Sequence, residues 1–146
     1  MNSVDFELKE FYEKSPSATI QDYLKFIEEK KLSEQENNIK KEEWYNQQVG
    51  KYYFVNHNGP RKTYYKLTSR NRYGFIADDS YTVDCRGLMS NEHNVFFNEA
   101  WLHNPYDKNS GNGVVVVTEI TENEFNEIVE KFKNFVVLIN EFYEIR

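Results

Sequence analysis

The sequence lacks several features that would assign it to a common class of protein. Cys85 is the only cysteine among 146 residues, so no disulfide can form within the chain, and a reducing compartment fits it. No window approaches the run of about 18 apolar residues that a membrane-spanning helix needs. Residues 1–7 contain neither a basic start nor an apolar run, so we expect no signal peptide. These absences predict a cytoplasmic protein with no membrane partner.

Motifs for catalysis, cofactor binding and metal binding are also missing. The sequence contains no Walker loop, no zinc-finger spacing and no signature of an RNA-recognition motif. His57, His93 and His103 lie too far apart for a recognisable metal site. Cys85 falls on the apolar face of a predicted strand, a position typical of a buried, unreactive cysteine. We therefore predict a protein that is not an enzyme, with no catalytic residue, no cofactor and no metal.

Composition and charge are those of an acidic globular protein. Apolar residues make up 39% of the chain and aromatic residues 16%, and the length predicts a single domain over residues 1–146. The net charge of −6 is unevenly distributed, because residues 51–77 carry six cations and no acid. The remaining residues therefore carry −12. A basic segment inside an acidic protein is the most unusual feature of the composition.

The last 33 residues predict a strand and a long helix that cover each other. Apolar residues on both faces of Val114–Val117 indicate a central strand, buried on two sides. Thr121 and Glu124 have the spacing of a capping box, which predicts the start of a helix. Apolar residues then recur at three- and four-residue steps along one stripe. The stripe comprises Phe125, Ile128, Val129, Phe132, Phe135, Val136, Ile139, Phe142 and Tyr143. We expect Phe132 and Ile139 to be fully buried.

Helices are predicted before residue 50. A first helix follows Ser3 and is broken at Ser15–Ser17, because Pro16 disfavours helical geometry at the residue before it. Ser17 or Thr19 can begin the next helix. A possible capping box at Ser33–Glu36 favours a break near Leu32–Ser33 over the alternative of one continuous helix across residues 19–48. Gly50 lies where a helix C-terminal cap is expected.

From Lys51 the apolar pattern changes to the two-residue period of strands. The predicted strands are Lys51–His57, Lys62–Thr68, Arg72–Ala77, Tyr81–Arg86, Val95–Leu102 and Val114–Ile120, with a tight turn at Asp78–Ser80. Their short links indicate neighbours that run antiparallel. The predicted fold class is α+β, with N-terminal helices, a five- or six-stranded mainly antiparallel sheet and a long C-terminal helix packed on the sheet.

The basic segment is as rich in tyrosine as in cations, which suggests binding of single-stranded nucleic acid or a nucleotide across residues 51–73. Alternation places Lys62, Tyr64 and Lys66 on one face of a strand, where cations can follow phosphates while the ring stacks on a base. Arg70 and Arg72 complete the candidate phosphate-binding set. The alternative interpretation is structural: the rings belong to the core and the cations pair with nearby acids. The surrounding acidic charge favours weak or no binding of oligonucleotides.

Three apolar residues are candidates for a protein interface. Trp101 lies in the predicted strand Val95–Leu102, which has large apolar residues on both faces, so this strand is either a central strand or an edge whose outer face meets a partner. Val137 and Leu138 lie off the main stripe of the last helix, so the second half of that helix is apolar around most of its circumference. One sheet can cover only one side. The N-terminal helices or a second copy of the chain must cover the rest, and we favour a homodimer contact.

The stretch Trp44–Leu67 contains Val-Gly-Lys-Tyr-Tyr at 49–53 and Thr-Tyr-Tyr-Lys-Leu at 63–67. It resembles segments of small accessory proteins of tailed bacteriophages, over about 24 of the 146 residues. The resemblance implies a protein that acts in a bacterial cytosol by binding or inhibiting a host component, and it transfers no site residues. The sequence therefore predicts a non-enzymatic, phage-type binding protein that engages a host protein, with nucleic-acid binding as the alternative.

Overall fold

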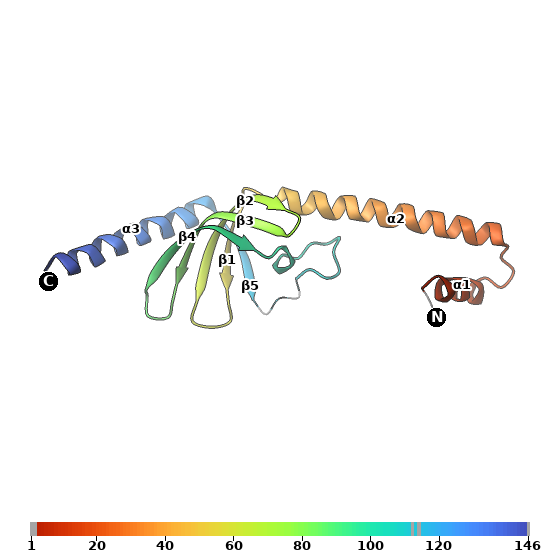
Figure 1. The fold of residues 1–146 in the computed structure, drawn as a ribbon, viewed down its shortest axis with the longest axis horizontal. Helices are drawn as coiled ribbons and strands as arrows, with labels where there is room; N and C mark the ends of the chain where they lie inside the picture. The colour runs from red at the N-terminus through yellow and green to blue at the C-terminus, as the bar shows by residue number, and fades with distance from the viewer. Residues whose placement is uncertain (1–2, 112, 114, 146) are drawn as a thin grey trace. The chain divides into compact units, whose positions relative to one another are not determined.

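The structure is a computed structural model that describes residues 3–111, 113 and 115–145. The described elements are α1 (Ser3–Lys14), α2 (Ile20–Gln47), β1 (Tyr52–Asn56), β2 (Lys62–Asn71), β3 (Gly74–Val83), β4 (Met89–Phe97), the 3-10 helix η1 (Glu99–Trp101), β5 (Val116–Ile120) and α3 (Glu122–Ile145) (Figure 1). The five strands form one antiparallel sheet in the order β4-β3-β2-β1-β5. The predicted α+β fold, with a long C-terminal helix packed on the sheet, is confirmed.

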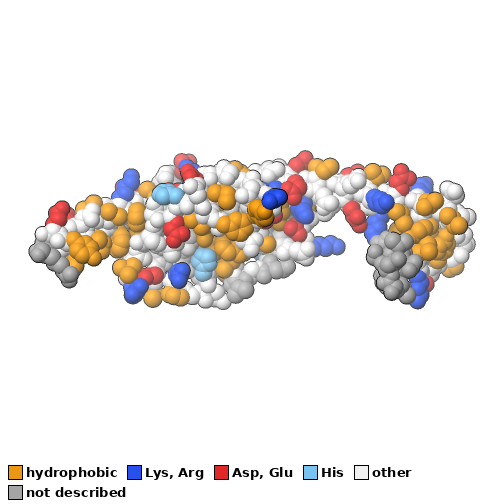
Figure 2. Space-filling model, viewed as in Figure 1, with side chains coloured by type: hydrophobic (Ala, Val, Ile, Leu, Met, Phe, Trp, Pro, Cys, Tyr) orange, Lys and Arg blue, Asp and Glu red, His pale blue; other side chains and the backbone are white. Residues whose placement is uncertain are grey.

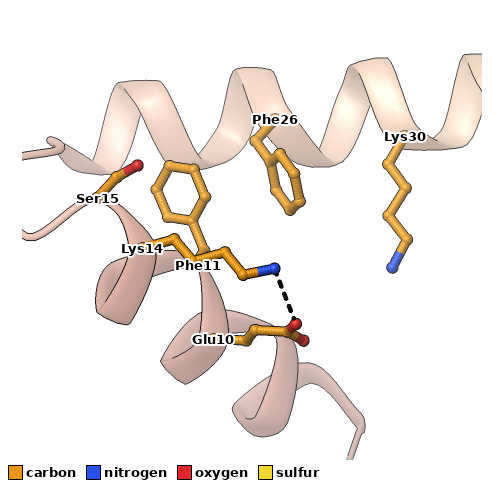
Figure 3. Close-up of a pocket in the computed structure, with 6 residues that line it drawn as sticks. All are labelled: Glu10, Phe11, Lys14, Ser15, Phe26 and Lys30. Carbon is orange, nitrogen blue, oxygen red and sulfur yellow. Dashed lines mark hydrogen bonds and ion pairs between the residues drawn. The ribbon is translucent and has the colours of Figure 1, made fainter.

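The chain divides into two compact units, residues 1–40 and residues 41–146. In the first unit, α1 and the N-terminal part of α2 are held together by the rings of Phe11, Tyr12, Tyr23 and Phe26. Their centroids lie 4.9 to 6.1 Å apart, within the range of favourable aromatic pairs. A cavity of about 370 Å³ opens beside this cluster (Figure 3). Its lining residues are Glu10, Phe11, Lys14, Ser15, Phe26 and Lys30.

Helix α2 begins where the sequence predicts and then runs without a break. Thr19 Oγ1 accepts a hydrogen bond from the Asp22 backbone N–H at 3.2 Å, and an Asp22 carboxylate oxygen accepts from Thr19 N–H at 2.9 Å. The predicted break near Leu32–Ser33 is wrong, and the alternative of one helix is correct. Ser33 is followed by good helix formers, and extending a helix is easier than nucleating a new one. Gly50 follows the helix with a φ of 93°, as expected for a C-terminal cap.

Strand β3 passes through the predicted Asp78–Ser80 turn, so that turn is wrong. Asp79 and Ser80 are tolerated inside the strand because their side chains bond to β4: Asn91 Nδ2 donates to Asp79 at 2.6 Å, and Ser80 Oγ donates to the Glu92 carbonyl at 3.2 Å. Asp78 has no partner in the register, which marks a β-bulge against β2. The reversals fall instead at residues 72–73 and 84–88.

Three further strand predictions need correction. The turn after β3 contains Cys85, which is exposed rather than buried. The predicted strand Val95–Leu102 ends at Phe97, because Asn98 accepts a hydrogen bond from Ala100 N–H at 3.0 Å and caps η1. β5 is an edge strand rather than a central one, and Val116 on it is exposed. Val114 lies outside the described residues. A run of valines indicates that both faces of a strand are apolar, but it does not indicate whether the strand is central or at the edge of the sheet.

The sheet has a core on each face. On one face, β1 to β4 pack against the end of α2 and the segment after β4, around the fully buried side chains Tyr45, Val55, Leu67, Phe75 and Phe97. On the other face, α3 packs through Phe125 and Ile128 against Tyr81. The capping box of α3 is confirmed, because Glu124 N–H donates to Thr121 Oγ1 at 3.1 Å and Thr121 N–H donates to the Glu124 carboxylate at 3.2 Å.

Candidate functional site

Helix α3 is longer than the sheet is wide. At 24 residues it is about 36 Å long, whereas five strands span about 20 Å. α3 starts after the edge strand β5, lies against β2, β3 and β4, and continues past β4 (Figure 1). About ten C-terminal residues therefore have no sheet beneath them.

The apolar stripe of α3 continues along this overhang. Phe125 is 2% exposed, but the side chains of residues 136–144 are exposed to solvent. The expectation for Phe132 holds only in part: it is partly buried, with its ring 5.3 Å from that of Tyr81. The expectation for Ile139 is wrong, because Ile139 is exposed beyond the sheet.

We define the α3 surface as the exposed apolar side chains Val136, Val137, Leu138, Ile139, Phe142 and Tyr143. Figure 2 shows hydrophobic side chains gathered over this end of the helix. Isolated exposed apolar residues are normal in proteins, whereas a contiguous patch marks an interaction site. Val137 and Leu138 are candidate interface residues from the sequence. The apolar stripe of the sequence predicts that the other four lie in the core, which is wrong. A comparison of the length of the predicted helix with the width of the predicted sheet is the signal that indicates their exposure.

The basic, tyrosine-rich strands show the predicted alternation. Thr63, Tyr65 and Leu67 of β2 are buried on one face, and Lys62, Tyr64 and Lys66 lie on the other. Lys62 is exposed, but Tyr64 is only half exposed, since its ring packs 5.0 Å from that of Phe54. Burial raises the pKa of the Tyr64 hydroxyl. The face that carries the cations is the one on which α3 packs.

The two candidate arginines lie apart from Lys62 and Lys66. Arg70 is almost buried, 4.8 Å above the Tyr45 ring, and it forms ion pairs with Glu42 and Glu99. The hydrogen bond from Arg70 lowers the pKa of Glu42. Arg72 lies at the exposed turn between β2 and β3, over the ring of Tyr73. Arg70 thus joins β2 to α2 and η1. The five residues predicted to bind phosphate or a base do not lie together in one site.

Trp101 packs onto the sheet from η1 instead of forming part of a strand. Its ring lies 5.1 Å from Phe97, 6.4 Å from Tyr65 and 5.8 Å from His57. The side chain is half-buried in the core on the face opposite α3. It also lines a cavity of about 340 Å³. Because Trp101 already fills a place in the core, its contacts explain its aromatic character without a partner.

The titratable groups with shifted pKa values lie in or beside the core, where burial and hydrogen bonds cause the shifts. The Tyr45 hydroxyl donates to Asp107 at 2.7 Å, and this hydrogen bond lowers the pKa of Asp107. Burial raises the pKa of Tyr81 to about 12 and lowers that of His57. Within the described ranges, no cluster of histidine, cysteine and carboxylate side chains could hold a metal ion.

Comparisons with models of protein families, with curated proteins and with solved structures gave no match. In the described part of the chain, no helix combines the length and the apolar character needed to cross a bilayer.

Proposed function

We propose that the protein is a non-enzymatic binding protein that associates with other protein through the α3 surface. The observation that carries this proposal is the exposure of six apolar side chains on one helix end. Both faces of the sheet already have their own cores, so this overhang contributes little to the fold of residues 41–146. A helix end that is apolar but does not support its own fold is typical of an interface.

Burial of the α3 surface supplies enough free energy for specific association. Side chains of these types and exposures offer on the order of 500 Å² per copy. At about 25 cal/mol per Å², its burial yields on the order of 10 kcal/mol before the entropy lost on association is subtracted. The resemblance of Trp44–Leu67 to small phage proteins favours a host protein as a target, which the chain would engage or inhibit alone or as a homo-oligomer.

The alternative function, binding of nucleic acid through residues 51–73, has one observation in its favour. Lys62, Tyr64 and Lys66 share a face of β2, as phosphate contacts beside a stacking ring require. Two of the segment's other cations are already paired: Arg70 with Glu42 and Glu99, and Lys51 with Glu119 at 3.1 Å. Fewer free cations remain to neutralise phosphates, so protein association is the better-supported function.

Photo-crosslinking tests the proposal whatever the identity of the partner. A photoreactive phenylalanine analogue replaces Tyr143 of the α3 surface, which is 64% exposed, in a nuclease-treated bacterial extract. The matched control carries the analogue at Tyr73, which is 66% exposed but lies at the β2–β3 turn. We expect a protein adduct, to another protein or to a second copy, from position 143 and not from position 73. Equal adducts at both positions, or none at 143, would contradict the proposed function.

A further inference from the structure

The charged residues of α3 between residues 131 and 144 are sorted by sign along the helix. Residues 131–144 contain four charged side chains: Lys131 and Lys133 at the beginning, and Glu141 and Glu144 at the end. All four are exposed. Leu138 lies midway between Lys133 and Glu144, and at 63% exposure it is at the centre of the apolar segment. Residues 131–144 of α3 are therefore positive at one end, negative at the other and apolar between them.

We infer that the α3 surface binds a second copy of itself, with the two helices antiparallel about a two-fold axis near Leu138. This inference rests on the proposed function, because it names the occupant of the same surface. Lys131 lies seven residues before Leu138 and Glu141 three residues after it, so both face the same side of the helix as Leu138. In the antiparallel arrangement, Lys131 of each copy therefore lies near Glu141 of the other. A parallel pair would place like charges side by side. The helix dipoles also oppose each other only in the antiparallel pair.

Both charged side chains, Lys131 and Glu141, are exposed and available for such a contact. An exposed ion pair contributes at most about 1 kcal/mol. The charges therefore select the orientation of the two helices, while burial of the apolar side chains between the charges stabilises the contact.

The size of the surface predicts a weak dimer. A two-helix contact over residues 131–144, with its charged side chains included, buries on the order of 1,000 Å² in total, at the lower end of specific protein interfaces. Such an interface is consistent with a dissociation constant on the order of 10 µM. Because the contact is isologous, each copy presents the same face of α3, the face around Leu138, and the assembly closes at two subunits.

Sedimentation equilibrium tests the dimer. In reductant, between about 1 and 200 µM, we expect the wild-type mass to rise from 17.5 kDa toward twice that value. Leu138→Lys should raise the dissociation constant at least about tenfold, because it places two lysines at the two-fold axis. Leu32→Lys, at a 53% exposed leucine on α2, is the matched control and should leave the constant unchanged.

Charge reversal tests the antiparallel orientation independently of Leu138. Lys131→Glu alone and Glu141→Lys alone should each weaken the dimer about fivefold, because each creates two repulsive contacts across the axis. The double variant should restore affinity close to that of the wild type. If single and double variants match the wild type, the antiparallel register is wrong.

A wild-type chain that stays at 17.5 kDa at about 200 µM overturns the inference. The photo-crosslinking experiment then separates two cases. An adduct from position 143 to a different protein would retain the proposed function with another occupant, whereas no protein adduct would remove both. An adduct between two copies, together with the expected charge-reversal series, establishes the antiparallel pair.

Discussion

Replacing Phe125 with alanine should cause a large loss of stability, because this side chain anchors α3 to the sheet. Phe125 is 2% exposed, and its ring lies 5.1 Å from that of Tyr52 and 5.7 Å from that of Tyr81. A buried Phe→Ala change costs about 3–5 kcal/mol through lost transfer free energy and the cavity that remains. Two aromatic contacts are lost as well, so we expect about 4 kcal/mol.

The matched control is Phe142→Ala on the same helix. Phe142 is exposed beyond the sheet, so its removal should lower the free energy of unfolding of the monomer by less than about 1 kcal/mol. Both variants remove the same atoms from the same type of element. Only the position relative to the sheet differs between them.

Urea unfolding measures the two changes. The half-buried Trp44 and Trp101 lie in the core on the opposite face, so their fluorescence reports loss of the whole sheet. With a slope of about 2 kcal/mol per molar, Phe125→Ala should lower the urea midpoint by about 2 M. Measurements at about 1 µM avoid any contribution from association. Equal midpoints for Phe125→Ala and Phe142→Ala would refute the claim that α3 is anchored only by its first half.

Two further predictions concern the basic segment. Arg70→Met should destabilise the fold by about 2 kcal/mol in the same assay, because two carboxylates lose their partner, and Lys62→Ala should not. For nucleic acid, we expect no submicromolar binding of a single-stranded oligonucleotide at physiological salt in a fluorescence-anisotropy titration. Salt-sensitive, submicromolar binding that is weakened by Lys66→Ala would instead favour the alternative function.

The sequence predicts those parts of the fold that depend on near neighbours. The capping box of Thr121 and Glu124 locates the start of α3, and alternation along β2 separates Tyr64 from Tyr65. Both signals involve residues within four positions of each other, so the backbone geometry follows from local sequence. For the same reason, the overall class of fold is predictable.

Signals that depend on distant partners are not visible in the sequence. Asp78–Ser80 has the composition of a turn, but the bonds that hold Asp79 and Ser80 in a strand come from Asn91 and Glu92 of β4. The edge position of β5 follows from its pairing with β1 alone, 60 to 68 residues away in the sequence. The exposure of Ile139 follows from the width of the sheet under α3. The candidate interface could therefore be predicted only in part, at Val137 and Leu138.

The order of the strands in the sheet predicts the order in which they pair during folding. β1 to β4 are joined by short turns, so their pairing closes small loops and can begin early. β5 must find β1 across a long stretch of chain, with Tyr52 opposite Ile120, and α3 follows it directly. We expect the four-stranded meander to nucleate folding, and β5 and α3 to dock late.

Stopped-flow measurements should then show Leu67→Ala slowing refolding and Phe125→Ala mainly accelerating unfolding. During that interval the free edge of β1 and the face that α3 later covers are open to other chains, so aggregation on refolding should increase with any change that delays the docking of α3.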